Sequence, residues 1–198
     1  INPENGDYVS SFQFSSLEFS LIEIKDFIEL SDGSILVAGN FQYSKSSNSN
    51  GVIKLHPDLS INRDFKTYIT RYGVTDLAIQ KDGKILVGGS FKEFNNKVAE
   101  GIVRLNSDGT LDSTFNLTRA KWEYYNINDI AIQKNGKILI GGRFVNEDKS
   151  THNFMRLNQD GSYDYSFPVI GYSYTRIINV IKILDNDTIF VGGDFDSI

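Results

Sequence analysis

Three aspartates, Asp26, Asp76 and Asp129, recur at spacings of 50 and 53 residues, each within an apolar segment. If these segments lie around a common axis, the three carboxylates would line a central channel and could bind a cation. The alternative is that each carboxylate caps backbone amides of the neighbouring repeat. We expect the second role, because three carboxylates without further oxygen ligands make a poor calcium site. The fourth copy of the segment has Val180 at this position.

Signatures of catalysis are missing from the chain. It has no cysteine, and its two histidines, His56 and His152, lie in loops of different type. It contains no Gly-x-Ser-x-Gly, no phosphate-binding glycine loop before a helix and no His-Glu-x-x-His. We therefore expect no enzyme, no catalytic residues and no cofactor. The loop carboxylates leave one alternative open, because a glycosidase needs only two carboxyl groups about 5–10 Å apart.

A second set of residues is suited to binding. Aromatic side chains and arginines gather in the segments that follow each repeat: Tyr68, Arg71, Tyr72, Trp122, Tyr124, Tyr125, Tyr172, Tyr174 and Arg176. These residue types are enriched at the centres of protein interfaces, and aromatic rings also stack on sugars. The alternative is that they cover the ends of the sheets and shield the core, since tyrosine and tryptophan suit any half-wet boundary.

Composition excludes some partners. The 198 residues carry a formal charge of −5, which argues against a nucleic-acid partner and against adhesion to anionic membranes. No apolar run approaches the roughly 18–20 residues of a membrane-spanning helix, so we expect no membrane insertion. Nothing resembles a signal peptide. The chain begins at Ile1 instead of a methionine, which leads us to expect a piece of a longer polypeptide.

Internal repetition is the strongest feature of the sequence. "QKDGKILVGGSF" at 80–91 returns as "QKNGKILIGGRF" at 133–144, with weaker copies at 30–41 and 184–195. Two independent anchors keep a period of about 50 residues: Gly33, Gly83, Gly136 and Asp187 in the turns, and Phe12, Phe65, Phe115 and Phe167 further on. A period in this range is typical of stacked or radial repeat architectures.

One repeat, residues 74–126, shows the expected elements. "VTDLAIQ" and "KILVGGSF" are strands joined by an Asp-Gly turn, and "GIVRLN" and "TLDSTF" are two more strands joined by another. No segment has a helical apolar stripe. The sequence therefore predicts an all-β fold: a β-propeller, or an arc of one, built from four-stranded antiparallel blades. All tight turns should lie at one end of the blades and the variable loops at the other.

Glycines, phenylalanines and arginines at recurring positions should hold the repeats together. The Gly-Gly pairs (Gly88 and Gly89 in the clearest repeat) would let a neighbouring blade or ring approach the backbone. Both phenylalanine series should pack between blades. Lys54, Arg104 and Arg156 recur in the third strand, and the two arginines should pair with Asp112 and Asp164 as exposed ion pairs worth about 0–1 kcal/mol.

The string "DGKILVGGSF…GIVRLNSDGTLDSTFN" resembles the delta-sixty repeat, a bacterial and phage β-propeller family of largely undefined activity. The near rival is the kelch repeat, which also has a double glycine, but the only tryptophan here, Trp122, lies in a connecting loop. The resemblance implies a propeller module within a large extracellular, cell-surface or virion protein. It implies no catalytic residues at positions of this chain.

Residues 1–198 should therefore form a single β-propeller region. We expect partial repeats at 1–23 and 178–198 and full repeats at 24–73, 74–126 and 127–177. The expected function is that of a non-enzymatic structural or interaction module with other protein subunits or glycans as partners. A carbohydrate-binding or carbohydrate-cleaving propeller, using the aromatic and acidic loops, is the alternative.

Overall fold

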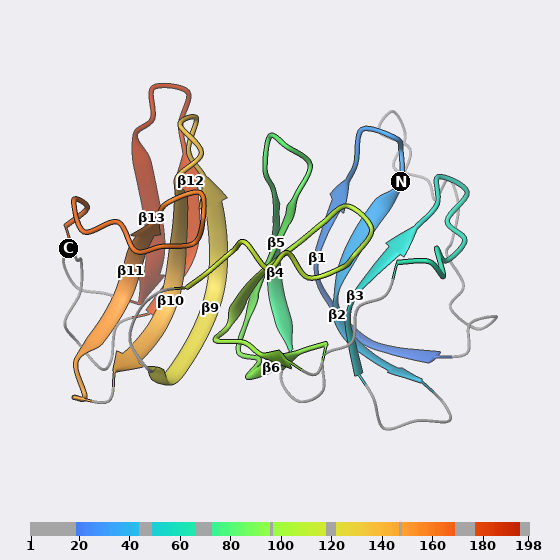
Figure 1. The fold of residues 1–198 in the computed structure, drawn as a ribbon, viewed down its shortest axis with the longest axis horizontal. Coiled ribbons are helices and arrows are strands. Elements are labelled where there is room, and N and C mark those ends of the chain that lie inside the picture. Colours follow the sequence, from blue (N-terminus) through green and yellow to red (C-terminus); the bar gives the residue numbers. More distant parts are fainter. Residues whose placement is uncertain are drawn as a thin grey trace.

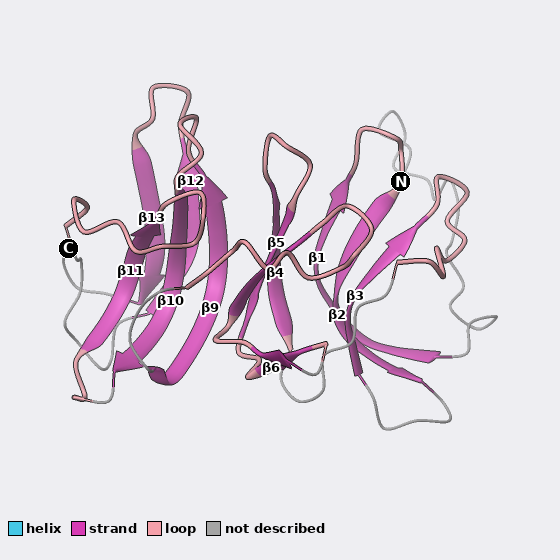
Figure 2. Ribbon diagram, in the orientation of Figure 1, coloured by secondary structure: helices cyan, strands magenta, loops and turns pink. Residues whose placement is uncertain are grey.

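The computed structural model describes residues 19–43, 49–65, 73–95, 97–117, 122–146, 148–168 and 177–194. Within these ranges the chain consists of strands, turns and loops without a helix, as the apolar pattern predicts (Figure 2). Accordingly, no helix capable of spanning a membrane occurs in this part of the chain.

Each repeat contributes one antiparallel sheet. The first sheet comprises β1 (Phe19–Glu29), β2 (Ile35–Tyr43) and β3 (Ser49–Leu55). The second comprises β4 (Val74–Ile79), β5 (Ile85–Gly89) and β8 (Ile102–Leu105), with the small hairpin β6 (Glu93–Phe94) and β7 (Lys97–Val98) inserted. The third comprises β9 (Trp122–Ile132), β10 (Ile138–Asn146) and β11 (Thr151–Leu157). The fourth contains β12 (Ile177–Ile183) and β13 (Ile189–Asp194).

The sheets follow one another along the long axis of the molecule (Figure 1). The first strand of each sheet contacts the first strand of the next, from β1 to β4, from β4 to β9 and from β9 to β12. We call these four the inner strands. The sheets made by the described residues form an open arc, with β1–β3 at one end and β12–β13 at the other (Figure 1).

The first three sheets have three strands among the described residues, and a fourth strand is not confirmed. Where it was expected, one residue pair bridges back to the third strand in each repeat: Leu55 with Ile61, Leu105 with Leu111, and Leu157 with Tyr163. The segment after the second turn thus returns to the sheet edge and pairs with it at a single point.

Tight turns connect the inner strands to the second strands, and they lie at one end of the sheets (Figure 1). In the second repeat the amide of Gln80 donates to the carbonyl of Lys84 at 2.8 Å, and Gly83 has a φ of +80°. The Asp-Gly prediction is confirmed, since this conformation favours glycine. The fourth repeat keeps the conformation without glycine, with a φ of +62° at Asp187.

In the second and third repeats, the next sheet approaches closely at the first glycine of the Gly-Gly pair. A Cβ placed on Gly88 would lie 2.7 Å from the Ile130 side chain, and one on Gly141 would lie 2.5 Å from that of Ile178. The predicted close approach of the next repeat is confirmed here. The second glycine has a different neighbour, because a Cβ on Gly89 would meet the carbonyl oxygen of Gly73, which precedes the inner strand of its own sheet.

Most of the recurring phenylalanines that the structure describes pack between sheets. Phe41, Phe91 and Phe144 are buried. In the second series, the Phe65 ring lies against Gly109 and the Phe115 ring against Gly161, each time in the following repeat. Packing between repeats is therefore confirmed for the described members except Phe41, which packs within its own sheet, and Phe12 and Phe195 lie outside the described residues.

The second turn of the first repeat contains a strained residue. Leu59 has a φ of +67° at the position where Gly109 and Gly161 have +85° and +90°. We expect Leu59→Gly to raise the free energy of unfolding by about 0.5–1 kcal/mol, because the left-handed conformation costs a non-glycine residue about 1–2 kcal/mol and glycine loses about 0.5–1 kcal/mol in chain entropy. Urea unfolding measures the change. Gly109→Ala is the reciprocal control and should destabilise; a destabilised Leu59→Gly variant would contradict the strain.

Candidate functional site

The three recurring aspartates strap successive inner strands together. In each case Oδ2 accepts a hydrogen bond from a backbone amide of the next repeat. The pairs are Asp26 with Leu77 (3.1 Å), Asp76 with Ile130 (2.6 Å) and Asp129 with Ile181. These are the contacts of the structural alternative, in which the carboxylate caps a neighbouring repeat. Across the described residues, no group of three or more His, Asp or Glu side chains is placed to hold a metal ion.

The second of these aspartates, Asp76, has a raised pKa. Burial between the sheets is the main cause that raises the pKa of Asp76, to about 8. The negative charges of Asp129 and Asp26 act in the same direction, and the amide of Ile130 opposes them. Near neutral pH the Asp76 carboxyl is therefore largely protonated and hydrogen-bonds Asp129. Two carboxyls that share a proton form a neutral-plus-charged pair, which avoids placing two adjacent negative charges in a partly buried site.

A cationic network closes the turn end of the second repeat. Arg104 Nε and Lys84 Nζ both donate to Asp112 Oδ2 at 2.7 Å. Arg104 Nη1 reaches the Gln159 carbonyl oxygen at 2.5 Å and Gln80 Oε1 at 3.3 Å. Because Gln159 belongs to the third repeat, this network also joins two sheets.

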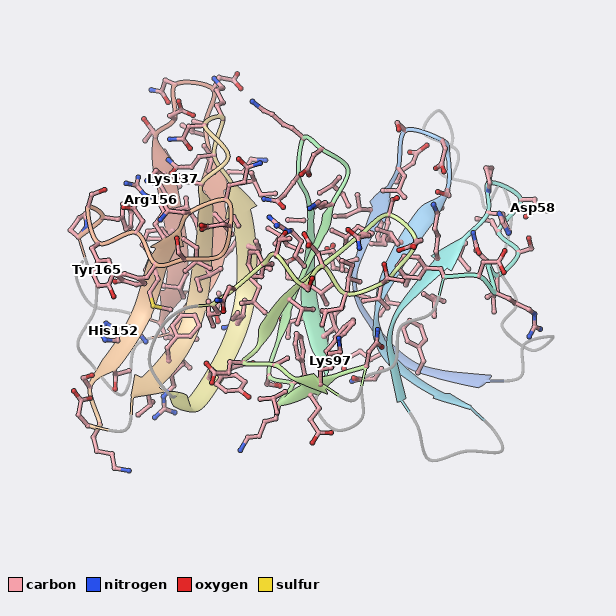
Figure 3. All side chains as sticks on the ribbon, in the orientation of Figure 1. Asp58, Lys97, Lys137, His152, Arg156 and Tyr165 are labelled. Carbon is pink, nitrogen blue, oxygen red and sulfur yellow. The ribbon has the colours of Figure 1, made fainter. Side chains whose placement is uncertain are left out.

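The third repeat has the same arrangement. Arg156 Nε and Lys137 Nζ donate to Asp164 Oδ2 at 2.7 and 2.6 Å, and the two cations lie together at the turn end (Figure 3). The Arg156 guanidinium also lies over the Phe167 ring, 4.4 Å from its centroid. A phenylalanine of the second series thus packs and holds the arginine in place.

The predicted pairs of arginine and aspartate are confirmed, but the prediction that they are exposed is wrong: in the third repeat the side chains of Arg156 and Asp164 are only 17% and 7% exposed. Arg104 and Asp112 are 5% and 6% exposed. Burial of Asp112 would raise its pKa, but hydrogen bonds from Lys84, Thr114 and Arg104 outweigh it and hold the pKa well below its usual range. The pair is buried because the second turn folds over the sheet and the next repeat covers it.

Lys54 occupies the same position in the first repeat, but it has no aspartate at the position of Asp112 to pair with. The first repeat has Asn62 where the others have Asp112 and Asp164. Lys54 Nζ lies 3.5 Å from Asp32 Oδ2, an exposed carboxylate. The first repeat therefore has a single weak surface pair in place of the network.

Most of the predicted loop-end binding residues lie outside the described residues: Tyr68, Arg71, Tyr72, Tyr172, Tyr174 and Arg176. Trp122 and Tyr124 are backbone members of β9, paired with Asn146 and Val145. Tyr125 is described in full and is 7% exposed. Its hydroxyl donates to the Ala99 carbonyl at 3.2 Å, and its ring lies against Gly101. Tyr125 therefore covers the gap between two sheets, as the shielding alternative requires.

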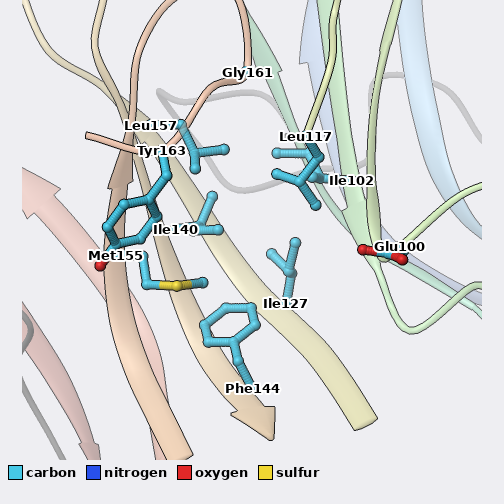
Figure 4. A pocket seen from close by; sticks show the side chains of 10 residues that line it. All are labelled: Glu100, Ile102, Leu117, Ile127, Ile140, Phe144, Met155, Leu157, Gly161 and Tyr163. Carbon is cyan, nitrogen blue, oxygen red and sulfur yellow. The ribbon is translucent and has the colours of Figure 1, made fainter. Parts of the chain in front are cut away.

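A narrow apolar pocket lies between the second and third repeats (Figure 4). Its walls include Ile102 and Leu117 of the second repeat, and Phe144 and Met155 of the third. One carboxylate, Glu100, lies at its rim, and burial raises the pKa of Glu100. The cavity volume is about 10 Å³, room for roughly one water molecule. The pocket is thus a packing gap between sheets.

Comparison with protein families identifies the repeat. A family model described as a domain of unknown function (DUF5122) β-propeller matches residues 30–65, 80–115 and 133–167. These ranges cover more than half of the chain, and each ends at a phenylalanine of the second series. The chain belongs to the DUF5122 β-propeller family. A β-propeller repeat is thereby shown, while the narrower delta-sixty resemblance stays a prediction.

Comparison with solved structures gives only a weak match to this DUF5122 chain. A solved protein of unknown function from Bacteroides caccae is similar at 12% identity and a TM-score of 0.40. The match covers 69% of this chain and 46% of that protein, so the DUF5122 chain spans less than half of its length. No curated protein matches the chain.

Two features of the DUF5122 repeats escaped the sequence analysis. Lys81 Nζ donates to the carbonyl of Lys134 at 2.6 Å, and Lys134 Nζ to that of Asp185, so the turns of successive repeats are tied together. The Gln-Lys pair before the turn in the second and third repeats was a usable signal. The second feature is a buried polar run in β11, Thr151 to Asn153, which no recurrence marks because the second repeat has "AEG" there.

The buried network should matter far more than its counterpart in the first repeat. We expect Arg104→Met to lower the free energy of unfolding by about 2–4 kcal/mol, because Asp112 would remain buried with only Lys84 as a charged partner. Lys54→Met is the matched control at the same position of the first repeat and should change it by less than about 0.5 kcal/mol. Chemical denaturation of both variants makes the comparison. Equal effects would show that burial of the pair is unimportant.

The acid pair should give the protein a stability that falls toward alkaline pH. The pKa of Asp76 is higher in the folded chain than in the unfolded chain, so the folded chain binds more protons between about pH 4 and 8, and stability falls as the pH rises through this window. The slope is at most about 1.4 kcal/mol per pH unit.

Asp76→Asn mimics the protonated carboxyl and should abolish this slope. Asp112 and Asp164, whose pKa values are lowered, lose their contribution only below about pH 4, outside the window. Thermal unfolding between pH 5 and 8 measures the effect. The same slope in Asp76→Asn and in wild type would refute the assignment.

Proposed function

We propose that this DUF5122 chain is a structural and interaction module without catalytic activity, part of a larger extracellular, cell-surface or virion protein. Its partners would be other protein subunits or glycans. In this proposal the segment after each second turn, which bridges to the third strand at one residue pair, serves as the outer edge of a four-stranded blade.

One observation carries the proposal: the polar side chains that recur in the repeats are engaged in holding the repeats together. The Asp76 carboxyl straps two inner strands, the Arg104 guanidinium joins two sheets, and Lys81 ties two turns. An active site on a repeat scaffold would need reactive groups that point into free space. The recurring carboxylates and cations are instead consumed by backbone and ion-pair contacts.

The residues that differ between repeats gather at the opposite end of the sheets. The turn end is uniform, whereas the loops between the second and third strands differ in length and sequence. Diverse loops on a regular scaffold are a common platform for recognition. Trp122 at the start of β9 belongs to this end, since it pairs with Asn146 at the end of β10.

A polysaccharide panel separates this proposal from the carbohydrate-cleaving alternative. We expect no release of reducing ends from any polysaccharide by the 198-residue chain, because no carboxylate pair acts on a substrate. Turnover of any member of the panel would overturn the non-enzymatic role.

Binding tests the loop end. Where the chain binds a glycan on an array or a subunit of its parent assembly, Trp122→Ala should weaken the affinity at least tenfold, as loss of an aromatic anchor does. Tyr165→Ala is the control, since Tyr165 is an exposed tyrosine outside the loop end. Equal affinities of both variants would remove Trp122 from the binding surface.

A further inference from the structure

The last two junctions between repeats share one construction, whereas the first junction has the buried Ala38 at the position of the glycine. An inner strand inserts two apolar side chains against the first glycine of the preceding sheet. At the junction of repeats two and three, the side chains of Ile127 and Ile130 come within 2.9 and 2.7 Å of a Cβ placed on Gly88. At the next junction Ile178 and Ile181 take these places against Gly141. Each of these two junctions therefore has a socket on one sheet and an inserted pair on the next.

The fourth sheet has a socket that no part of the described chain fills. Gly192 stands at the position of Gly88 and Gly141, and the side chain nearest to it belongs to Val180 of its own sheet. Phe190 is 58% exposed, whereas Leu86 and Leu139 at the same position are fully buried. Val180 is 53% exposed. We call Val180, Phe190 and Gly192 the socket face.

The first sheet has the complementary feature. Ile24 and Phe27 of β1 occupy the positions of Ile127 and Ile130, and they are 45% and 67% exposed. We call Ile24 and Phe27 the insert face. Val37 and Ile53 in the outer part of the same sheet are buried, so the open part is confined to the inner strand. Among the described residues, the chain thus carries the two halves of one junction, each without its counterpart.

The two faces lie at opposite ends of the arc (Figure 1), so they do not meet within the part of one chain that the structure describes. We propose that they meet between copies: the insert face of one chain packs on the socket face of a second copy, head to tail. The geometry is that of the two internal junctions at Gly88 and Gly141, which fixes both partner and orientation. This proposal rests on the function as an interaction module and names one partner, the chain itself.

The new junction differs from the internal ones in one respect. The internal sockets carry Asp26, Asp76 and Asp129, whose carboxylates accept an amide of the inserted strand. The fourth socket has Val180 there, so the amide of Phe27 would face an apolar side chain. A contact limited to inner strands and lacking this hydrogen bond is a small interface, for which we expect a dissociation constant on the order of 10–100 µM. Its contact is heterologous, since different surfaces meet.

Sedimentation equilibrium of the 198-residue chain tests the proposal. From about 1 to 300 µM, the average mass should rise from 22.3 kDa to at least twice that value. Phe190→Glu and Phe27→Glu should each weaken association at least tenfold, because each places a charge in one of the two faces. Val98→Glu introduces the same charge at an exposed valine outside both faces and should associate like wild type. All variants alter exposed positions, so equal melting temperatures are expected.

Mixing the two variants gives the decisive result. A Phe190→Glu chain retains its insert face and a Phe27→Glu chain retains its socket face, so an equimolar mixture should form one-to-one dimers that grow no further. A wild type that stays monomeric at 300 µM, variants that associate like wild type, or a mixture without recovery would each overturn the proposal. The proposed function fails separately, through polysaccharide turnover, which does not depend on self-association.

Discussion

The contact on which the structure depends is the close approach of an inner strand to the first glycine of the preceding sheet. At Gly141 even a methyl group would collide with Ile178. The absent side chain lets an isoleucine of the next repeat sit directly on the backbone, and the aspartate strap then reaches the amide beside it. Apolar contact supplies most of the stabilisation of such a junction, because burial of an isoleucine contributes about 1.5–3 kcal/mol. The hydrogen bond from the amide to the aspartate sets the register, because it fixes the position of one sheet along the other.

Charged groups are used differently at the turn end. A buried pair such as Arg104 and Asp112 recovers its desolvation cost only if the remaining donors and acceptors are satisfied. Here Lys84 shares the carboxylate and a carbonyl of the next repeat accepts from the guanidinium. The network is therefore complete only when the next sheet is in place, which couples an electrostatic arrangement to repeat stacking. In the first repeat, which has Asn62 at the position of the aspartate, Lys54 pairs weakly with Asp32 instead.

Much of the fold could be predicted because it depends on local chemistry that recurs. Turns with positive φ require glycine, strands require alternation, and a phenylalanine every 50 or so residues has to pack on something. Burial could not be predicted in the same way. Arg104 and Tyr125 have side chains that suit a surface, and they are buried because another repeat lies over them. The distance between sheets decides that outcome, and no single repeat contains the information. Of the aromatic residues predicted to bind a partner, Tyr125 is therefore part of the core.

Comparing the exposure of equivalent residues across the four sheets shows where the fourth sheet differs from the others. Leucine at one position of the second strand is fully buried in the first three sheets, and Phe190 replaces it in the fourth, larger and more than half exposed. A large ring left in water raises the free energy of the isolated arc, because its apolar area remains hydrated. A terminal repeat that ended the scaffold would instead carry a polar outer face, as the caps of other repeat proteins do. The fourth sheet combines an apolar ring, a retained glycine and a lost aspartate, and this combination suits a junction that is completed by contact and held by packing alone.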